Sequence, residues 1–393
     1  MKLKSVIQIV GGVCLLAAAF LLAPAAGAQG TTQESQGKAR VYYIAADEVE
    51  WNYMPSGMDK TMGMPFEGIN KMYSERGPHN IGSTYRKAIY REYTDGTFTH
   101  LKPRPPEWAH AGILGPILRA EVGDTIRVTF KNNATHPYSM HPHGVFYLKD
   151  SEGSQYADGT SGADKDDDAV PPGGRHVHVW QVPERAGPGP NDPSSIVWLY
   201  HSHTNELMDV NSGLVGAIIV TRRGMADADG KPKDVDREVV CLFMMFDENL
   251  GWYVDHNIQA YTTDPKGVKK SEILPVDNQG SLAPIGTGFL AANLRFAING
   301  YLFGNGPMMT MKQGERVRWY LMSLGEASNL HSPHWHGNTV MQDGRRTDVV
   351  SLLPAQMVTV DMVPDDPGTW LFHCHVDDHM AAGMSAFYKV EPR

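Results

Sequence analysis

The sequence predicts an all-β protein built from two β-sandwich domains. Short segments alternate polar and apolar residues at 125–130, and the pattern returns at 317–321 and 358–362. This period of two residues is typical of half-buried strands. The chain also holds 40 Gly and 26 Pro, and no long stretch has helical periodicity. Together these observations favour a sandwich architecture.

The sequence repeats itself, which indicates two copies of one sandwich. Three segments of the first half resemble three of the second in the same order: 121–128 and 312–319, 141–144 and 334–337, 198–203 and 370–375. A chain of 393 residues is long enough for two cores. The polar, Gly- and Pro-containing stretch between the copies reads as a linker. We therefore predict a first domain at 40–222, a linker at 223–237 and a second domain at 238–393.

The first residues are typical of an export signal. Lys2 and Lys4 precede an apolar stretch at 6–22, and Ala26-Gly27-Ala28 supplies a cleavage site. We expect residues 1–28 to be a cleaved signal peptide, which leaves a secreted or periplasmic protein without membrane contact. An uncleaved membrane anchor is the alternative, because the apolar stretch is nearly long enough to span.

Composition excludes one class of partner and suggests one metal. With 35 Lys+Arg against 44 Asp+Glu the net charge is −9, and no basic run suggests a nucleic-acid partner. The chain is also rich in histidine and methionine, with 17 and 20 residues. Both side chains are copper ligands.

Pairs of histidines separated by one residue carry the strongest functional signal. On a strand, residues i and i+2 point to the same face, so each pair presents two imidazoles side by side. His176 and His178 share this spacing, and we interpret them as a solvated strand face. Four other pairs occupy repeat-equivalent positions, and their eight imidazoles suit a cluster of three coppers: His141/His143, His201/His203, His334/His336 and His373/His375.

Cys374 lies between the last two histidines, and alternation sends it to the opposite face of the strand. His331 stands an odd number of residues before His334, so it also faces away from that pair. With His379 and Met384 these residues make a two-His, one-Cys set with an axial Met, the ligand set of a blue copper centre. Zinc suits this set poorly, because it rarely takes methionine and cannot use a redox path.

The His-Cys-His triplet gives electrons a short bonded path from the blue copper to the cluster, so we assign catalytic roles to His373, Cys374 and His375. The first repeat has non-ligands in place of the blue-copper set: Tyr138, Ser202, Leu207 and Ser212. Electrons would therefore enter only through the second domain.

The three cysteines allow one ordinary disulfide. Cys14 leaves with the signal peptide, and Cys241 with Cys374 would be the ordinary pair in an exported protein. The histidines around Cys374 favour a metal instead. Cys241 lies in an apolar run and is expected to be a buried structural thiol.

Four motifs resemble the copper motifs of multicopper oxidases: HPHG, YHSH, HSPHWHG and HCHVDDHMAAGM. Longer stretches at 90–98, 114–174 and 198–220 are similar to the ceruloplasmin and hephaestin branch. The resemblance implies cupredoxin-like (plastocyanin-like) Greek-key domains, four coppers per chain and reduction of O2 to water. It places the type 2 copper on His141 and His334, and the type 3 pair on His143, His201, His203, His336, His373 and His375. The type 1 copper would lie on His331, Cys374, His379 and Met384.

The resemblance also bears on assembly and substrate. In two-domain relatives the cluster lies between neighbouring chains, which implies a homotrimer with cyclic interfaces. Asp378 matches one acidic residue of the ferroxidase site, and we include it among the catalytic candidates. A Glu and a His expected nearby are Ala291 and Phe296 here. The reductant therefore stays open between phenols or aromatic amines and metal ions.

Two further features have two interpretations each. Met54, Met58, Met62 and Met64 offer thioethers for Cu(I), although packing against the first domain is the favoured interpretation. Residues 166–168, three consecutive aspartates, offer oxygen ligands for Ca2+ or form a solvated acidic loop.

The sequence thus predicts an oxidase that uses O2 and a small-molecule or metal-ion reductant. Two other classes of copper protein are alternatives. A copper nitrite reductase has no three-copper cluster, and the eight paired histidines argue against it. A copper-storage protein has no use for the bonded path at Cys374.

Overall fold

The computed structural model describes residues 37–78, 80–273, 287–327 and 329–393. The predicted signal peptide, residues 1–28, lies outside them. None of the helices in the described part of the chain is long and apolar enough to span a bilayer.

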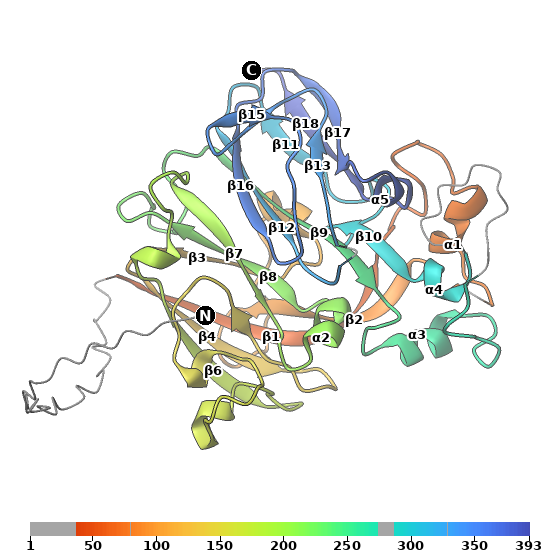
Figure 1. Ribbon diagram of the computed structural model, residues 1–393, viewed down its shortest axis with the longest axis horizontal. Coiled ribbons are helices and arrows are strands. Elements are labelled where there is room, and N and C mark those ends of the chain that lie inside the picture. The colour runs from red at the N-terminus through yellow and green to blue at the C-terminus, as the bar shows by residue number, and fades with distance from the viewer. Residues whose placement is uncertain (1–36, 79, 274–286, 328) are drawn as a thin grey trace, which may run out of the picture. The chain divides into compact units, whose positions relative to one another are not determined.

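The predicted all-β fold is confirmed: strands dominate and the helices are short (Figure 1). Strands of the first half form two four-stranded sheets, ordered β2-β1-β4-β6 and β3-β8-β7-β5. Their bounds are β1 Ala39–Asn52, β2 Thr84–Tyr93, β3 Ile117–Glu121, β4 Thr125–Asn132, β5 His141–Pro142, β6 Arg175–Gln181, β7 Ser195–His201 and β8 Val215–Thr221, with helices α1 Lys71–Ser74 and α2 Glu206–Ser212.

Strands of the second half, green to blue in Figure 1, form a six-stranded and a four-stranded sheet, ordered β10-β9-β12-β16-β14-β15 and β11-β18-β17-β13. Their bounds are β9 Arg237–Asp247, β10 Leu294–Ile298, β11 Met309–Lys312, β12 Val317–Ser323, β13 Pro333–Trp335, β14 Val340–Gln342, β15 Arg345–Thr347, β16 Met357–Met362, β17 Gly368–Cys374 and β18 Ser385–Glu391, with helices α3 Val254–Tyr261, α4 Phe289–Ala292 and α5 Asp377–Ala381.

Strand β4 has the half-buried alternation that the sequence predicts. Ile126, Val128 and Phe130 are fully buried, whereas Arg127 is exposed. Strand β12 differs, because all its residues are buried. Two of its polar side chains reach the first half of the chain: Arg318 Nη1 donates to Ser195 Oγ at 2.7 Å, and the Tyr320 hydroxyl lies 2.7 Å from the same oxygen. In β12 the apolar residues thus face the core, and the alternating polar residues face the interface with the first half instead of solvent.

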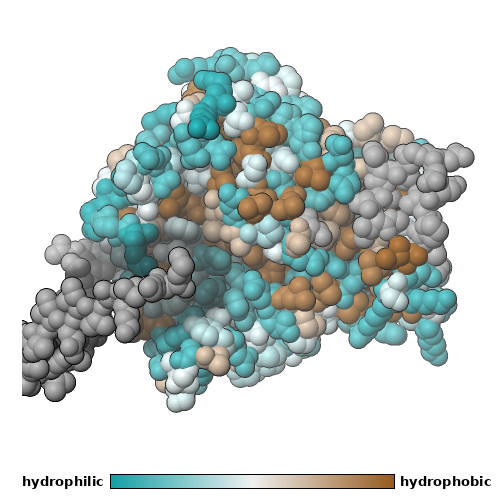
Figure 2. Space-filling model, in the orientation of Figure 1, coloured by the Kyte–Doolittle hydropathy of each residue, from teal (hydrophilic) through white to brown (hydrophobic). Residues whose placement is uncertain are grey.

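An ion pair and a shared apolar core join the two halves of the chain. Arg119 of β3 donates through both terminal nitrogens to the Glu238 carboxylate of β9, at 2.7 and 3.1 Å. Leu199 of β7 and Ile219 of β8 belong to the same buried cluster as Trp319 of β12. On the described part of the face in Figure 2, apolar side chains lie interspersed among polar ones. The main apolar surfaces of the sandwiches are therefore buried inside each half and between them.

The interpretation of His178 as part of a solvated strand face is wrong. His178 is fully buried on β6, with its ring next to those of Phe130 and Trp180. Burial lowers the pKa of His178 to about 3, so the ring is neutral. His176 lies at the edge of this face, with Nε2 2.6 Å from the carbonyl oxygen of Asp150. The spacing correctly places the two rings on one face, but that face is the inner one.

Candidate copper sites

Three ligand atoms converge at the end of β17. The Sγ atom of Cys374 lies 3.7 Å from Nδ1 of His379 and 3.9 Å from Nδ1 of His331. The two Nδ1 atoms are 3.2 Å apart, and all three residues are buried. Cys374 ends β17, His379 lies on the single turn of α5, and His331 precedes β13. A metal ion between these atoms would have the soft and imidazole ligands that suit copper.

Neighbouring groups hold these ligands in place. The carbonyl of Met384 accepts from the Cys374 amide at 3.1 Å, and the Met384 amide donates to the carbonyl of His379 at 2.9 Å. The Met384 side chain is fully buried. Nε2 of His331 donates to Oδ1 of Asn329 at 3.3 Å, which leaves the lone pair on the Nδ1 that faces Cys374. Burial lowers the pKa of His331 to about 3, which keeps this lone pair free of protons.

The paired histidines gather on the other face of the same strands. His334 of β13 lies opposite His373 of β17 in the ladder, and the ligand atoms of His334, His336 and His373 lie within 4.8 Å of one another. Nε2 of His336 is 3.1 Å from Nε2 of His373. The His375 ring is 5.3 Å from that of His334. Four imidazoles of the second half thus form one group.

The first half repeats this arrangement. His141 of β5 pairs with His201 of β7, as their counterparts do in the second half. Nε2 of His143 is 3.1 Å from Nε2 of His201, and the rings of His141 and His203 are 5.2 Å apart. Burial lowers the pKa of His143 to about 4, as it does for His373 in the second half. The rings of His143 and His373 are therefore neutral.

Backbone carbonyls orient the rings, a feature that sequence reasoning missed. Nδ1 of His141 lies 2.6 Å from the carbonyl oxygen of Glu152. Nδ1 of His334 lies 3.0 Å from that of Asp348, and Nδ1 of His373 lies 2.8 Å from that of Cys374. An Nδ1–H that donates to a carbonyl leaves the lone pair on Nε2, which then faces the other rings. Main-chain acceptors have no side-chain signature, so no motif indicates them.

The two groups of four are separate within one chain. No hydrogen bond or ring contact between described residues joins the first group, His141, His143, His201 and His203, to the second, His334, His336, His373 and His375. A cluster that uses all eight imidazoles would need a first-half group and a second-half group to face each other.

The first-half counterpart of the Cys374 site is filled by a polar network. The Ser202 hydroxyl donates to Asp209 Oδ2 at 2.7 Å, and Trp252 Nε1 donates to Asp209 Oδ1 at 2.8 Å. The Tyr138 and Tyr253 hydroxyls are 3.1 Å apart. Leu207 is about half exposed and has no ligand atom, and the Ser212 hydroxyl donates to the carbonyl of Met208. These groups satisfy one another, so this position has no set of free metal ligands.

The surroundings of His379 are apolar where the resemblance anticipated a Glu and a His. Phe296 is buried, and its ring centroid lies 4.8 Å from that of His379. Ala291 is also buried and carries no ligand atom. Asp378, on the first turn of α5, is partly exposed beside His379.

The methionine run does not pack as expected. Only Met54 is buried, at 1% exposure, whereas Met58, Met62 and Met64 are 40%, 70% and 37% exposed. The segment is hydrogen-bonded to the second half of the chain: the Lys60 amide donates to the carbonyl of Phe303. The expectation that the run packs against the first domain is therefore wrong, because its hydrogen-bond partner Asn305 lies 247 residues from Met58 in the sequence.

Two of the three consecutive aspartates are buried. Asp166 is exposed, but Asp167 and Asp168 are 0% and 5% exposed. Asp167 Oδ2 accepts from the Gly153 amide at 2.6 Å, while its Oδ1 is buried without a hydrogen-bond partner among the described residues. Burial raises the pKa of Asp167 to about 6. The aspartates at 166–168 are therefore not simply a solvated acidic loop. A buried carboxylate oxygen without a hydrogen-bond partner is suited to bind a cation.

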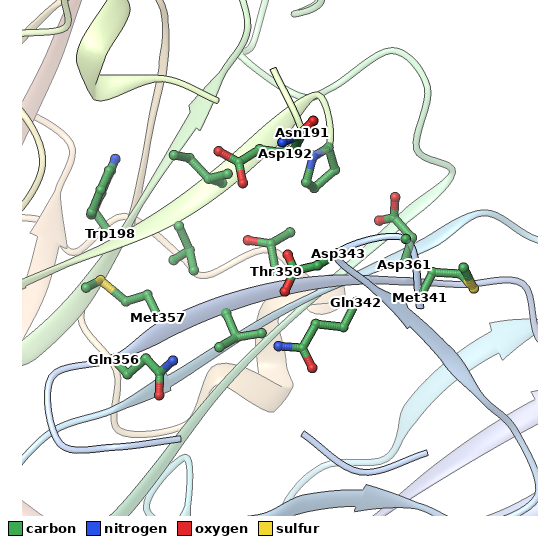
Figure 3. A pocket seen from close by; sticks show the side chains of 15 residues that line it. Asn191, Asp192, Trp198, Met341, Gln342, Asp343, Gln356, Met357, Thr359 and Asp361 are labelled. Atoms are coloured by element: carbon green, nitrogen blue, oxygen red, sulfur yellow. The ribbon is translucent and has the colours of Figure 1, made fainter. Parts of the chain in front are cut away.

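A groove of about 500 Å³ runs between the halves, with Trp198 of β7 on one side and Met357 and Thr359 of β16 on the other (Figure 3). None of the predicted copper ligands lines it. The groove is thus distinct from both groups of ligands. Cys241, as expected, is a buried free thiol.

Comparisons with known proteins identify the family. Two family models described as multicopper oxidase match residues 108–224 and 284–393. The chain is 45% identical to "Ferroxidase HEPHL1" of Homo sapiens over 90% of its length, and 42% identical to human hephaestin over 91%. It is 37% identical to ceruloplasmin of Rattus norvegicus over 89%. The chain spans only 29%, 30% and 31% of these three relatives.

Solved structures agree on the fold. "Multicopper Oxidase mgLAC" matches with a TM-score of 0.55 and 18% identity, covering 90% of this chain and 86% of that one. Another structure, "Crystal structure of multicopper oxidase", matches with a TM-score of 0.52, also at 18% identity, and covers 90% and 88%. On the strength of the two family matches and the relatives, this chain belongs to the multicopper oxidase family of oxidoreductases.

Proposed function

We propose that this chain takes single electrons from a small reductant at Cys374 and passes them to a three-copper cluster that reduces O2 to water. One observation carries the proposal: Cys374 lies within 3.9 Å of His331 and His379 on one face, while His373 faces His336 on the other. Bound copper would supply a one-electron acceptor on the first face and a four-electron reductant of O2 on the second. The donor sets fit, since a thiolate and neutral imidazoles suit copper.

The chain's own residues would carry out the remaining tasks. The backbone of Cys374 continues directly into His373 and His375, so the two sites are connected by a few covalent bonds. His331, Cys374, His379 and Met384 would hold the type 1 copper, in a buried pocket that excludes water. Asp378 directly precedes the buried His379 on α5 and is itself partly exposed, so a reductant would approach the site there.

Eight imidazoles would form the cluster. We propose that His141 and His334 hold the type 2 copper. The type 3 pair would be held by His143, His201, His203, His336, His373 and His375. Because the two groups of four do not meet within one chain, each cluster would join the first half of one copy to the second half of the next. Three copies arranged head to tail would close such a ring.

Mixing two inactive variants tests the shared cluster. His143→Ala disables the first-half group, and His336→Ala disables the second-half group. If clusters form between copies, dissociating and reassembling the two variants together restores O2 uptake with a phenol, because some interfaces join two intact groups. Each variant reassembled alone is the control. If the mixture stays inactive while wild-type protein survives the same treatment, the cluster lies within one chain.

A direct copper count tests the proposed chemistry. We expect four coppers per wild-type chain and O2 uptake with at least one of a phenol, Fe(II) and Cu(I). Four coppers with no O2 uptake from any of these reductants would contradict the oxidase proposal.

We also propose that Asp167 and Asp168 bind Ca2+, supported by the unpaired, buried Oδ1 of Asp167. Calcium would then raise the thermal midpoint of the wild type and leave the thermal midpoint of Asp167→Asn unchanged.

The domain organisation that we propose is a first cupredoxin domain at 40–222, a linker at 223–237 and a second cupredoxin domain at 238–393. The chain would be exported after loss of residues 1–28. N-terminal sequencing of exported protein would test the cleavage.

A further inference from the structure

We propose that Asp167 is a positioning residue for His141, and that it acts through the peptide group between Glu152 and Gly153. This inference rests on the proposed function, in which His141 and His334 hold the type 2 copper. It gives a carboxylate that lies outside the ligand set a role in holding one of the two ligands.

A single peptide group connects the two side chains. Its carbonyl oxygen, from Glu152, lies 2.6 Å from Nδ1 of His141. Its N–H, from Gly153, donates to Oδ2 of Asp167, also at 2.6 Å. Because a carbonyl oxygen can only accept, Nδ1 of His141 carries the proton, and Nε2 keeps its lone pair for a metal. We name this pair of hydrogen bonds the Asp167 relay.

The two hydrogen bonds of the relay strengthen each other. A carboxylate that accepts from a peptide N–H forms a charge-assisted hydrogen bond, which is shorter and about twice as strong as a neutral one. It also polarises the peptide group, so that the carbonyl oxygen becomes a better acceptor for the Nδ1–H of His141. An imidazole whose N–H is held in this way is a more basic metal ligand. Asp167 therefore acts on His141 without touching it.

Close packing fixes the peptide group of the relay beside His141. Gly153 has φ +69°, and a Cβ atom there would collide with the carbonyl oxygen of Met140, which directly precedes His141. The carbonyl of Gly153 accepts from the Ser139 hydroxyl at 2.7 Å. The peptide group therefore cannot turn away from the imidazole without breaking these contacts.

Asp167 is completely buried, which is costly for a carboxylate unless hydrogen bonds compensate for the lost water. Its Oδ2 accepts from Gly153, whereas its Oδ1 has no hydrogen-bond partner in the described part of the chain. The segment that carries Asp167 is anchored nearby, because Val170 and Tyr138 exchange backbone hydrogen bonds at 2.9 and 3.1 Å. One oxygen thus holds the peptide group, and the other stays free for the proposed Ca2+.

The second half has the same arrangement with a hydroxyl in place of the carboxylate. Nδ1 of His334 lies 3.0 Å from the carbonyl oxygen of Asp348. The N–H of that peptide group, from Val349, donates to Oγ1 of Thr347 at 3.2 Å. Both distances exceed those of the relay, and a neutral hydroxyl polarises a peptide group less than a carboxylate does. The type 2 copper would therefore have one strongly and one weakly supported imidazole.

Removing the charge of Asp167 tests the relay. Asp167→Asn keeps the shape of the side chain and leaves a neutral acceptor for Gly153. We expect the dissociation constant for the type 2 copper to rise about threefold to tenfold, less than the roughly 10- to 100-fold effect of a partner bonded directly to a ligand. The type 2 signal in electron paramagnetic resonance, followed against a competing copper chelator, measures this constant. The blue absorption of the Cys374 site should keep its wild-type intensity, which verifies the fold.

Two controls separate the relay from other effects of the substitution. Asp166→Asn removes an equal charge from the adjacent, exposed carboxylate and should bind the type 2 copper like the wild type. Measurements in calcium-free buffer remove any contribution of the proposed Ca2+ site, and the difference between Asp167→Asn and the wild type should persist there. An equal loss in Asp166→Asn, or a difference that disappears without calcium, would overturn the relay.

Nuclear magnetic resonance of the metal-free protein tests the relay without copper. With isotopically labelled histidine, the Nδ1 proton of His141 should resonate further downfield than that of His334, because its hydrogen bond is shorter. His141→Gln and His334→Gln assign the two signals, and Asp167→Asn should shift only the first one upfield. Equal positions of the two signals in the wild type would contradict the relay, even if Asp167→Asn does not fold. If the wild type binds no type 2 copper but the signals differ as expected, the proposed function fails and the relay stands.

Discussion

The Ser202 hydroxyl donates to the buried Asp209 carboxylate at 2.7 Å, in the position that Cys374 occupies in the second half. A thiol is a weak donor, so Ser202→Cys should weaken one of the two hydrogen bonds that Asp209 Oδ2 accepts and leave only the one from the Asn205 amide, at 2.9 Å, intact. We expect a loss of about 1–3 kcal/mol in the free energy of unfolding, measured by urea titration. The variant should gain no second blue centre, because Tyr138 and Leu207 stand where the histidines would be. A second intense visible band would show that the new cysteine alone creates the site.

Cys374→Ser should remove the proposed blue centre and leave the paired imidazoles in place. The serine oxygen is a harder ligand than a thiolate, so we expect the intense visible absorption to vanish and copper content to fall from four to three per chain. The measurement is a visible spectrum with a metal count. Electron paramagnetic resonance of the remaining coppers checks that the cluster persists. A blue band that survives would move the type 1 site elsewhere.

His178 should make the protein less stable in acid. Its pKa falls from 6.5 to about 3 because the ring is buried, so between these values the unfolded chain binds a proton that the folded chain excludes. Stability is therefore lost as the pH drops below 6.5. Relative to wild type, His178→Phe should gain up to about 1.4 kcal/mol of unfolding free energy per pH unit in this window.

Urea titrations of both chains at several pH values measure this difference. The other histidines contribute equally to the pH dependence of the unfolding free energy in both proteins, so their contributions cancel in the difference. A stability difference that stays constant from neutral pH into the acid range would contradict the assignment.

A buried ion pair between the halves gives a prediction about stability. Lys87 of β2 contacts Glu248, which follows β9, and both side chains are almost completely buried. Glu248→Leu would leave the Lys87 ammonium without its counter-charge, at a cost of about 3–5 kcal/mol. Removing both charges with Lys87→Met and Glu248→Leu should recover much of this loss. Chemical denaturation of Glu248→Leu and of the double variant measures the unfolding free energy that each loses. Equal losses in the two variants would indicate that the ion pair itself stabilises the fold.

Strand periodicity predicted much of the fold and grouped the candidate ligands. Alternation is a local property, so the opposite orientations of Cys374 and His373 follow from adjacent positions in the sequence. It cannot tell which face is buried by a distant part of the chain. His178 and Arg318 therefore lie in unexpected surroundings, one beside Trp180 and the other against Ser195.

Other features had no local signal at all. The carbonyls of Glu152 and Asp348 that orient His141 and His334 are main-chain groups, and side-chain motifs do not report them. The position of the methionine loop depends on the contact of Lys60 with Phe303, two residues far apart in the sequence. Long-range contacts of this kind become visible only when the chain is folded.

The contacts of Arg318 with Ser195 and of Arg119 with Glu238 have a consequence for how copies would assemble. With the shared core, they attach the two sandwiches to each other on both sides of the proposed linker at 223–237. The direction from one histidine group to the other is then a fixed property of the single chain. In the proposed ring this direction determines how many copies complete a full rotation. Variants that remove the contacts between the sandwiches would therefore change the number of subunits in the proposed ring, although every copper ligand stays in place.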